Sequence, residues 1–304
     1  MTTGSTGGAA ERSAWLAGRF EEQRPRLRAV AYRMLGSLSE AEDAVQETWL
    51  RAERADTDVV ENLAGWLTTV AGRVCLNMLR SRASRREDPM DVRIPDPVVD
   101  PADGVDPEHE ALLADSVGLA LLVVLDSLAP AERLAFVLHD MFGVPFDEIA
   151  PLIDKTAAAT RQLASRARRR VQGRSPVPDP DHTRQRAAVD AFFAAARGGD
   201  LEALVAVLDP NVVLRSDGGV LRARHTVVLQ GARTVASQAV TFGSLSPYAR
   251  PALINGTAGA VVVADDGRRI SIMAFTVTDG AITAIDVVAD PERLRELDLK
   301  PAGF

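Results

Sequence analysis

Two proline-rich breaks divide the chain and limit what each part can fold into. The first covers residues 89–107 and holds five prolines among many aspartates, and the second is the stretch SPVPDPD at residues 175–181. Proline has no N–H to donate and disfavours the helical conformation of the residue before it, so neither stretch continues a helix. Apolar residues recur at helical spacing before each break, and β-rich runs appear only after the second. The 304 residues therefore predict several domains.

The segment before the first break predicts three helices. Residues 15–35 form the first, which Gly36 ends. Ser39 and Glu42 form a capping box that starts the second, on which apolar residues take one face and a polar face with one apolar residue takes another. That second face consists of Asp43, Gln46, Glu47 and Leu50. The third helix, about residues 63–82, presents Arg73, Asn77 and Arg80 opposite its apolar side.

The segment between the breaks predicts a helix-turn-helix. Apolar helices are expected at about residues 112–128 and 130–142, followed by a turn at Gly143. A short helix at 146–153, a tight turn, and a longer arginine-bearing helix that Thr156 caps complete the pattern.

Arginine is concentrated in two of these helices. The net charge of −7 argues mildly against nucleic-acid binding. However, residues 73–86 hold five arginines and no acid, and residues 156–174 hold six arginines and no acid. Phosphate attraction is local, because charges are screened over roughly 8–10 Å at physiological salt. Both helices can therefore bind a polyanion, although a solvated charged face remains the alternative for each.

The segment after the second break predicts an α+β domain. Helices are expected at 187–196, 201–208 and about 234–242, with a first strand at 212–214. Four β-rich runs follow at 251–254, 260–264, 270–277 and 282–288. The Asp-Gly pairs between the last three runs are typical of hairpins, so these strands form an antiparallel meander.

Composition excludes several classes of protein. The single cysteine, Cys75, rules out an internal disulfide and fits a reducing cytosol. The four histidines lack metal-ligand spacing, so no metal or cofactor is expected. The apolar run 117–125 is far too short for a bilayer, and the N-terminus has no apolar signal region, so no membrane partner is expected.

The motifs before the second break resemble those of bacterial extracytoplasmic-function (ECF) sigma factors of RNA polymerase. The resemblance covers SEAEDAVQETWLRAER at residues 39–54, WLTTVAGRVCLNMLRSRASRR at 66–86, and the region at 128–172 that ends in the arginine-rich helix. It implies that Asp43, Gln46 and Glu47, with Leu50 beside them, dock on the clamp helices of the polymerase β′ subunit, and that the β flap is a second contact. The loop at residues 56–62 corresponds to the one that receives a flipped base.

The resemblance also implies promoter DNA as a partner. The helix and basic extension that meet the minus-ten region match Arg73, Asn77, Arg80, Arg82, Arg85 and Arg86. The helix that reads the minus-thirty-five element matches Thr156, Ala159, Arg161, Gln162, Ser165, Arg166 and Arg168.

Residues 184–219 resemble the opening of a SnoaL-like domain, the α+β cone shared with ketosteroid isomerases. ECF sigma factors with this extension form a sigma-J-like subgroup. Its Trp-Leu-Pro-Glu-Pro, Asp-Gly-Gly-Gly-Lys and Asn-Pro-Asp-Lys-Leu motifs are only partly matched here, by residues 93–97, Asp217-Gly218-Gly219 and residues 290–294. The resemblance implies that the domain contacts the first break and regulates activity in cis. The residues expected to make that contact are Pro95, Asp96, Pro97, Asp217, Gly218, Gly219, Asp290 and Pro291.

The expected architecture is multidomain, with two all-α sigma domains followed by an α+β cone. The expected boundaries are a disordered 1–12, sigma region 2 at 13–88, a linker at 89–108, sigma region 4 at 109–174, a linker at 175–182, the SnoaL-like domain at 183–290 and a tail at 291–304.

Two other functions stay open from the residues. A cyclase or isomerase would need an ionisable residue in the cone, for which Asp217, Asp286 and His225 are candidates. No catalytic residue is assigned, and a small ligand in the cone is an alternative to catalysis. A repressor that binds DNA without polymerase is the other rival.

Overall fold

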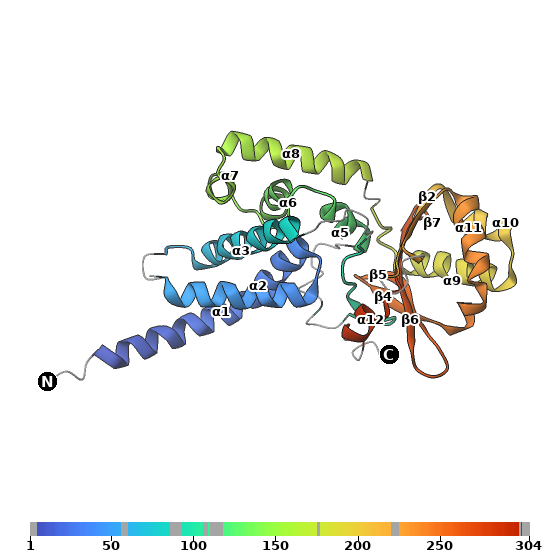
Figure 1. Cartoon of the computed structure of the whole chain (residues 1–304), viewed down its shortest axis with the longest axis horizontal. Coiled ribbons are helices and arrows are strands. Elements are labelled where there is room, and N and C mark those ends of the chain that lie inside the picture. Colours follow the sequence, from blue (N-terminus) through green and yellow to red (C-terminus); the bar gives the residue numbers. More distant parts are fainter. Residues whose placement is uncertain are drawn as a thin grey trace. The chain divides into compact units, whose positions relative to one another are not determined.

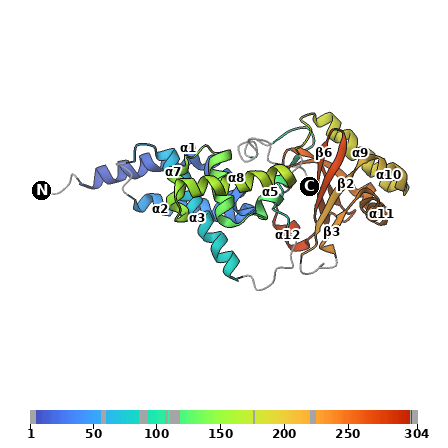
Figure 2. The same ribbon diagram turned by 90° about the horizontal axis from the view of Figure 1, so that it is seen from above.

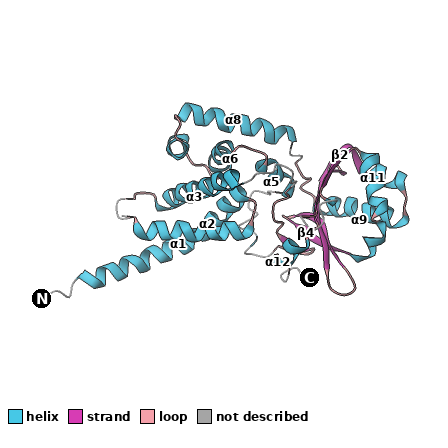
Figure 3. Cartoon of the chain, in the orientation of Figure 1, coloured by secondary structure: helices cyan, strands magenta, loops and turns pink. Residues whose placement is uncertain are grey.

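The computed structural model describes residues 5–55, 60–85, 93–105, 109, 118–174, 177–219, 225–297 and 299. The chain divides into two compact units, Met1–Glu87 with Leu125–Arg170, and Asp88–Val124 with Val171–Phe304 (Figure 1). Every described strand belongs to the second unit (Figure 3). None of the described helices combines the length and the apolar character that crossing a bilayer needs.

Three long helices begin the first unit: α1 (Ser5–Leu35), α2 (Leu38–Arg54) and α3 (Leu63–Arg85). Their apolar faces bury Phe20, Leu27, Val45 and Leu67, and Trp49 packs edge-on against Phe20 at a ring distance of 5.1 Å. The predicted apolar faces are therefore confirmed.

The N-terminal ends of α1 and α2 differ from expectation. The helix α1 starts at Ser5, so the disorder predicted for residues 1–12 is wrong from Ser5 onward. Ala9, Ala10, Glu11 and Arg12 favour helix, whereas Gly7 and Gly8 before them do not. The cap of α2 is Ser37, whose Oγ accepts from Glu40 N at 3.5 Å. The capping box at Ser39 and Glu42 is therefore wrong, and the Glu42 carboxylate accepts instead from Arg28 Nε at 2.6 Å.

The predicted helix-turn-helix is present in the first unit. It is built from α6 (Pro130–Phe136), a π-helical turn at Val137–Met141, α7 (Phe146–Ile149), a 3-10 turn at Ala150–Ile153, and α8 (Ala157–Arg174). Helix α5 (Leu119–Asp126) precedes it. Asp154 turns the chain with a left-handed φ of 53°, and Thr156 Oγ1 accepts from Ala159 N at 3.2 Å, which confirms the predicted cap of α8.

The helices from both sides of the first break pack together in this unit. Gly72 on α3 lies so close to α6 and the turn after it that a Cβ there would approach Leu138 Cδ1 to 2.8 Å. The buried Arg133 on α6 donates from Nε to the Arg33 carbonyl at 3.1 Å and from Nη1 to Asp126 Oδ1 at 2.8 Å. Burial lowers the pKa of Arg133, and the Asp126 carboxylate opposes that shift.

The second unit is built on a seven-stranded sheet with the order β1-β4-β5-β6-β7-β2-β3, counted over the described ranges. Its strands are β1 (Val99–Pro101), β2 (Leu208–Asp217), β3 (Val227–Gln230), β4 (Ala249–Ile254), β5 (Thr257–Val263), β6 (Arg269–Thr278) and β7 (Ala281–Val288). β4 to β7 form the predicted antiparallel meander, whereas β2 runs parallel to β7.

Helices cover one face of this sheet. Helices α9 (His182–Gly198), α10 (Leu201–Val207) and α11 (Ala232–Thr241) lie on the same side of the strands in both views (Figures 1 and 2). A 3-10 turn at Gly243–Tyr248 follows α11. Phe192 and Phe193 of α9 pack edge-on against Phe275 of β6, which ties the helices to the sheet. This is the α+β cone that the resemblance implied.

Two edges of the sheet were not predicted. Residues 99–101, predicted to be linker, form β1 and pair antiparallel with β4, with Val99 opposite Ile254. At the other edge, β3 pairs with β2 from a stretch that was given no strand. The predicted tail also contains a short helix, α12 (Pro291–Glu296), which Asp290 caps.

Candidate nucleic-acid interface and linker site

Helix α8 presents an exposed polar face. Ala164 and Ala167 are buried, whereas Arg161, Gln162 and Arg169 are exposed. The guanidinium of Arg161 lies over the Phe146 ring, 5.3 Å from its centroid, so α7 orients it. Arg161 and Gln162 therefore combine exposure with the side chains that pair with guanine and adenine edges.

Other arginines of α8 are held by acids of the preceding helices. Arg168 is paired with Asp140, and it donates from Nε at 2.8 Å. Glu132 accepts from Arg170 Nη1 at 3.0 Å and lies 3.6 Å from Arg166 Nε. These pairs fasten α8 to its neighbours, so a phosphate would compete with Asp140 for Arg168.

The remaining predicted residues of α8 lie at its start and on its flank. Thr156 is exposed but its hydroxyl caps the helix, and Ala159 and Ser165 are half-buried.

On α3, the predicted stripe is exposed. Arg73, Asn77 and Arg80 face solvent, while Val74 and Cys75 between them are buried. Arg82 is instead engaged within the unit, since it pairs with Glu40 and donates from Nη1 to the Leu35 carbonyl at 3.3 Å.

Two predicted elements lie partly outside the described residues. The Arg85 side chain, Arg86 and residues 56–59 of the base-receiving loop lie outside the described residues. At the end of that loop, Asn62 Oδ1 accepts from Gly65 N at 3.0 Å and so caps α3.

The face of α2 predicted to bind polymerase is solvent-exposed. Asp43 and Gln46 are exposed, and Glu47 accepts from Arg51 Nε at 2.8 Å. Leu50 is 41% exposed, which is high for a large apolar side chain flanked by polar ones.

Within the second unit, residues 94–96 of the first break are bound to the α+β cone through Arg293 and Asp217, an arrangement that we name the linker clamp. Arg293 of α12 donates from Nη1 to Asp217 Oδ2 at 2.6 Å, and from Nη2 to Asp96 Oδ1 at 2.7 Å and the Ile94 carbonyl at 2.6 Å. Asp217 Oδ2 also accepts from Ile94 N at 3.2 Å. The side chains of Arg293, Asp217 and Asp96 are only 15%, 9% and 14% exposed.

The two glycines after Asp217 pack against the residues that support the clamp. Gly219 has a φ of +64°, and a Cβ there would overlap the Asp290 side chain. Gly218 N donates to Thr226 Oγ1 at 3.1 Å. Pro95 and Pro97 are buried, and Pro291 is half-buried in the first turn of α12. The residues predicted to contact the linker are thus brought together.

Arg293 is the residue of this site that was not singled out. The sequence did contain a signal for it. Arg293 stands in the stretch DPERL where the Asn-Pro-Asp-Lys-Leu motif of the subgroup has lysine, so both have a basic residue at this position. A guanidinium can serve two carboxylates and a carbonyl at once because its N–H groups form a planar fork.

Further contacts hold the rest of the linker. Asn255, with a φ of 50°, accepts from Val98 N at 3.1 Å and donates from its own N to the Val98 carbonyl at 2.8 Å. His109 Nδ1 lies 2.6 Å from Oδ1 of the buried Asp100.

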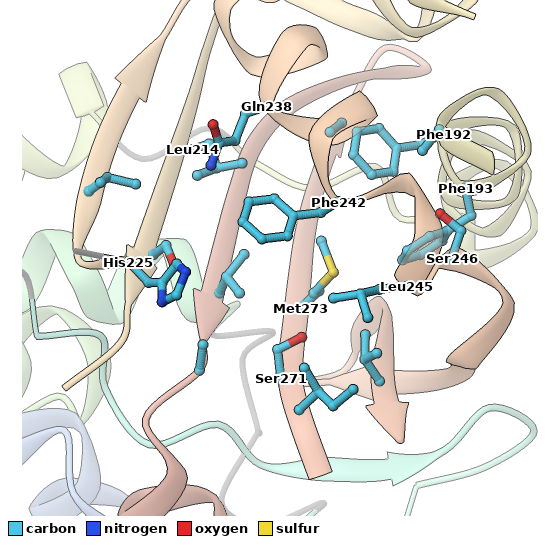
Figure 4. Close-up of a pocket in the computed structure, with 18 residues that line it drawn as sticks. Phe192, Phe193, Leu214, His225, Gln238, Phe242, Leu245, Ser246, Ser271 and Met273 are labelled. Atoms are coloured by element: carbon cyan, nitrogen blue, oxygen red, sulfur yellow. The ribbon is translucent and has the colours of Figure 1, made fainter. Parts of the chain in front are cut away.

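The three ionisable candidates for catalysis in the cone have different surroundings. Asp217 belongs to the linker clamp. Asp286 is buried and accepts from Arg215 Nη1 at 3.1 Å; burial raises the pKa of Asp286, and Arg215 opposes that shift. Only His225 lines the cavity of about 230 Å³ inside the cone (Figure 4). In the described ranges no group of three or more metal-ligating side chains occurs.

Comparison with known proteins agrees with this architecture. Residues 19–85 match the model of Sigma-70 region 2, and residues 118–171 match that of Sigma-70, region 4. The chain is 38% identical over 306 residues to the ECF RNA polymerase sigma factor SigJ of Mycobacterium tuberculosis, covering 93% of this chain and 96% of that protein. It is 35% identical to a probable ECF RNA polymerase sigma factor, SigI, of the same species, covering 90% and 93% of the two chains.

A solved structure resembles most of the chain as well. The crystal structure of M. tuberculosis SigJ matches with a TM-score of 0.75 at 36% identity, over 93% of this chain and 99% of that one. Two helical sigma regions, a linker and an α+β cone therefore recur together, and this chain belongs to the ECF RNA polymerase sigma factors, which are transcription initiation factors.

Proposed function

We propose that this sigma factor binds RNA polymerase core, reads both promoter elements through its two basic helices, and is regulated in cis by its C-terminal cone. The observation that carries the cis regulation is the linker clamp, in which a single guanidinium joins the cone to residues 94–96. We place the protein in the cytoplasm, where RNA polymerase acts.

Helix α8 is the reader of the minus-thirty-five element in this proposal. Arg161 and Gln162 make base contacts, and Arg169 contacts phosphate. Arg166 and Arg168 join them when DNA phosphates replace Glu132 and Asp140 as partners. Each such exchange releases a counterion and adds to the salt dependence of binding.

Helix α3 contacts the minus-ten region through Arg73, Asn77 and Arg80. Unstacking a base costs a few kcal/mol, which a pocket and backbone contacts must offset. Polymerase core shares that work, and it docks on the α2 face through Asp43, Gln46, Glu47 and Leu50.

The cone acts through the linker and not as an enzyme. Asp217 and Asp286 are both occupied by arginines, so neither carboxylate is available as a base in the cavity. Docking the linker on the sheet shortens the chain that is free to separate the two sigma regions. The clamp therefore shifts the equilibrium between docked and released linker by its differential affinity for the two states.

In vitro transcription with polymerase core tests this function. Genomic fragments are transcribed with the full chain, and start sites are mapped. The Arg161→Ala variant should lose about 1–3 kcal/mol of binding at a cognate promoter, whereas Arg197→Ala, an exposed arginine on α9, should not. An absence of any specific transcript with core would overturn the function, and equal loss on all sequences would make Arg161 a phosphate contact.

The cis regulation has its own test. Asp96→Ala removes the linker's carboxylate from the clamp, and Arg295→Ala, on the exposed side of α12, is the matched control. Promoter output should change with the first and not with the second. The same output from both variants would refute regulation through the clamp.

A further inference from the structure

The cavity in the cone has the lining of a binding site for an apolar molecule. Its walls come from α9, α11, the turn after α11, and strands β2, β3, β5, β6 and β7. Phe242 and Met273 lie at the centre of the labelled side chains, with Phe192 and Phe193 on one side and His225 on the other (Figure 4). Among its described lining residues there is no carboxylate, lysine or arginine. A charged ligand would lose its hydration there without a carboxylate, lysine or arginine to pair with.

A few polar side chains in the cavity wall could orient a bound ligand. In Figure 4, His225 and Gln238 lie on the left of the cavity, Ser246 on the right and Ser271 at its lower centre. In the part of the chain that the structure describes, no hydrogen bond to another residue engages these four side chains. They can therefore accept from and donate to a ligand that carries one or two hydroxyl or carbonyl groups.

The volume limits the size of such a ligand. A dry cavity of about 150 Å³ holds benzene, and this one measures about 230 Å³. In proportion, the six non-hydrogen atoms of benzene scale to about nine, close to the size of two fused rings.

The cavity wall is continuous with the linker clamp. Ser216, His225 and Ala289 line the cavity. The residue after each belongs to the clamp or supports it: Asp217 binds Arg293, Thr226 accepts from Gly218 N, and Asp290 caps α12, which carries Arg293. Ala289 N donates to the Asp217 carbonyl at 2.7 Å, which ties two of these segments together. The same strand ends therefore form the cavity wall and hold the linker.

We propose that the cavity binds a neutral, largely apolar ring compound with one or two hydrogen-bonding groups, and that its occupation strengthens the hold on the linker. The coupling is reciprocal, because a docked linker orders the strand ends that the ligand contacts. The regulatory half rests on the proposed cis regulation, whereas the binding half does not.

Calorimetric titration of the full-length protein with 2-naphthol tests the binding half. Ala239 of α11 lines the cavity, so Ala239→Phe should fill it and weaken binding about tenfold or more. Ser237→Phe, exposed on the same helix, is the control and should bind as the parent chain does. The charged analogue 2-naphthoate should bind about tenfold more weakly or not at all. No binding of 2-naphthol, or equal binding by Ala239→Phe with an unchanged thermal unfolding profile, would overturn the site.

The coupling is tested with Asp96→Ala, which removes the linker carboxylate that Arg293 binds. Its affinity for 2-naphthol should fall about fivefold, the lower range of allosteric coupling. An unchanged affinity would overturn the coupling and leave the site intact. If instead Asp96→Ala weakens 2-naphthol binding but leaves promoter output unchanged, the binding site and its coupling to the linker stand, and the effect on promoter output, which rests on the cis regulation, fails.

Discussion

Replacing Arg293 with alanine should release the linker from the cone without unfolding the cone. The substitution removes charge-assisted hydrogen bonds to Asp217, Asp96 and the Ile94 carbonyl, all between 2.6 and 2.7 Å. It also leaves the carboxylate of Asp217, which is only 9% exposed, with the Ile94 and Gly219 amides as its remaining donors.

The free-energy loss expected for Arg293→Ala depends on how deeply the clamp is buried. Removing one partner of a fully buried pair costs about 3–5 kcal/mol, and a fully exposed pair contributes about 0–1 kcal/mol. The Arg293 side chain is 15% exposed, so the clamp lies close to the buried limit. We expect a loss of about 2–4 kcal/mol in the free energy that holds residues 94–98, which corresponds to about 30- to 1,000-fold faster amide exchange.

Hydrogen exchange measured by mass spectrometry reports the free energy that holds residues 94–98 on the cone. The amides of Ile94 and Val98 donate to Asp217 Oδ2 and Asn255 Oδ1, so both are protected while the linker is docked. Peptides from this stretch should exchange faster in Arg293→Ala, and peptides from β6 should not. Arg295→Ala is the control. Unchanged exchange at residues 94–98 in a folded Arg293→Ala protein would refute the clamp as the main hold on the linker.

Three further outcomes are expected. Asp140→Ala removes the carboxylate that competes with DNA phosphate for Arg168, so duplex affinity should rise; fluorescence anisotropy measures it, and an unaltered affinity would contradict the competition between Asp140 and DNA. Leu50→Ala should change the midpoint of thermal unfolding little, because an exposed side chain contributes within about 0.5 kcal/mol, yet weaken capture of polymerase core; undiminished capture would remove Leu50 from that face. Burial raises the pKa of Cys75 to about 12, and the nearby Arg133 charge only partly opposes this. The thiol therefore stays protonated at pH 8, and a maleimide should label it far more slowly in the native chain than in denaturant, whereas equal rates would show that Cys75 is accessible.

Local pattern was sufficient for the elements that carry the sigma function. The apolar spacing of α2 and α3 predicted which faces are buried, since side chains three and four apart share one side of a helix. Proline placed the breaks because the lost donor acts within the chain itself. The helix caps were not fixed by the local pattern, because Ser37 and Ser39 both satisfy it. In the structure Ser37 caps α2.

Only the tertiary structure decided which distant residues meet. β1 is three residues in a proline-rich break, and its strand character depends on β4, which lies about 150 residues further along the chain. Arg293 becomes the centre of the clamp because α12 places it against Asp217 and Asp96 together. Likewise, Asp140 and Arg168 meet only once the helix-turn-helix has folded. Short-range periodicity determined the helices and most strands of this protein, whereas the linker clamp, the parallel pairing of β2 with β7 and the cavity arise from long-range contacts that no local pattern encodes.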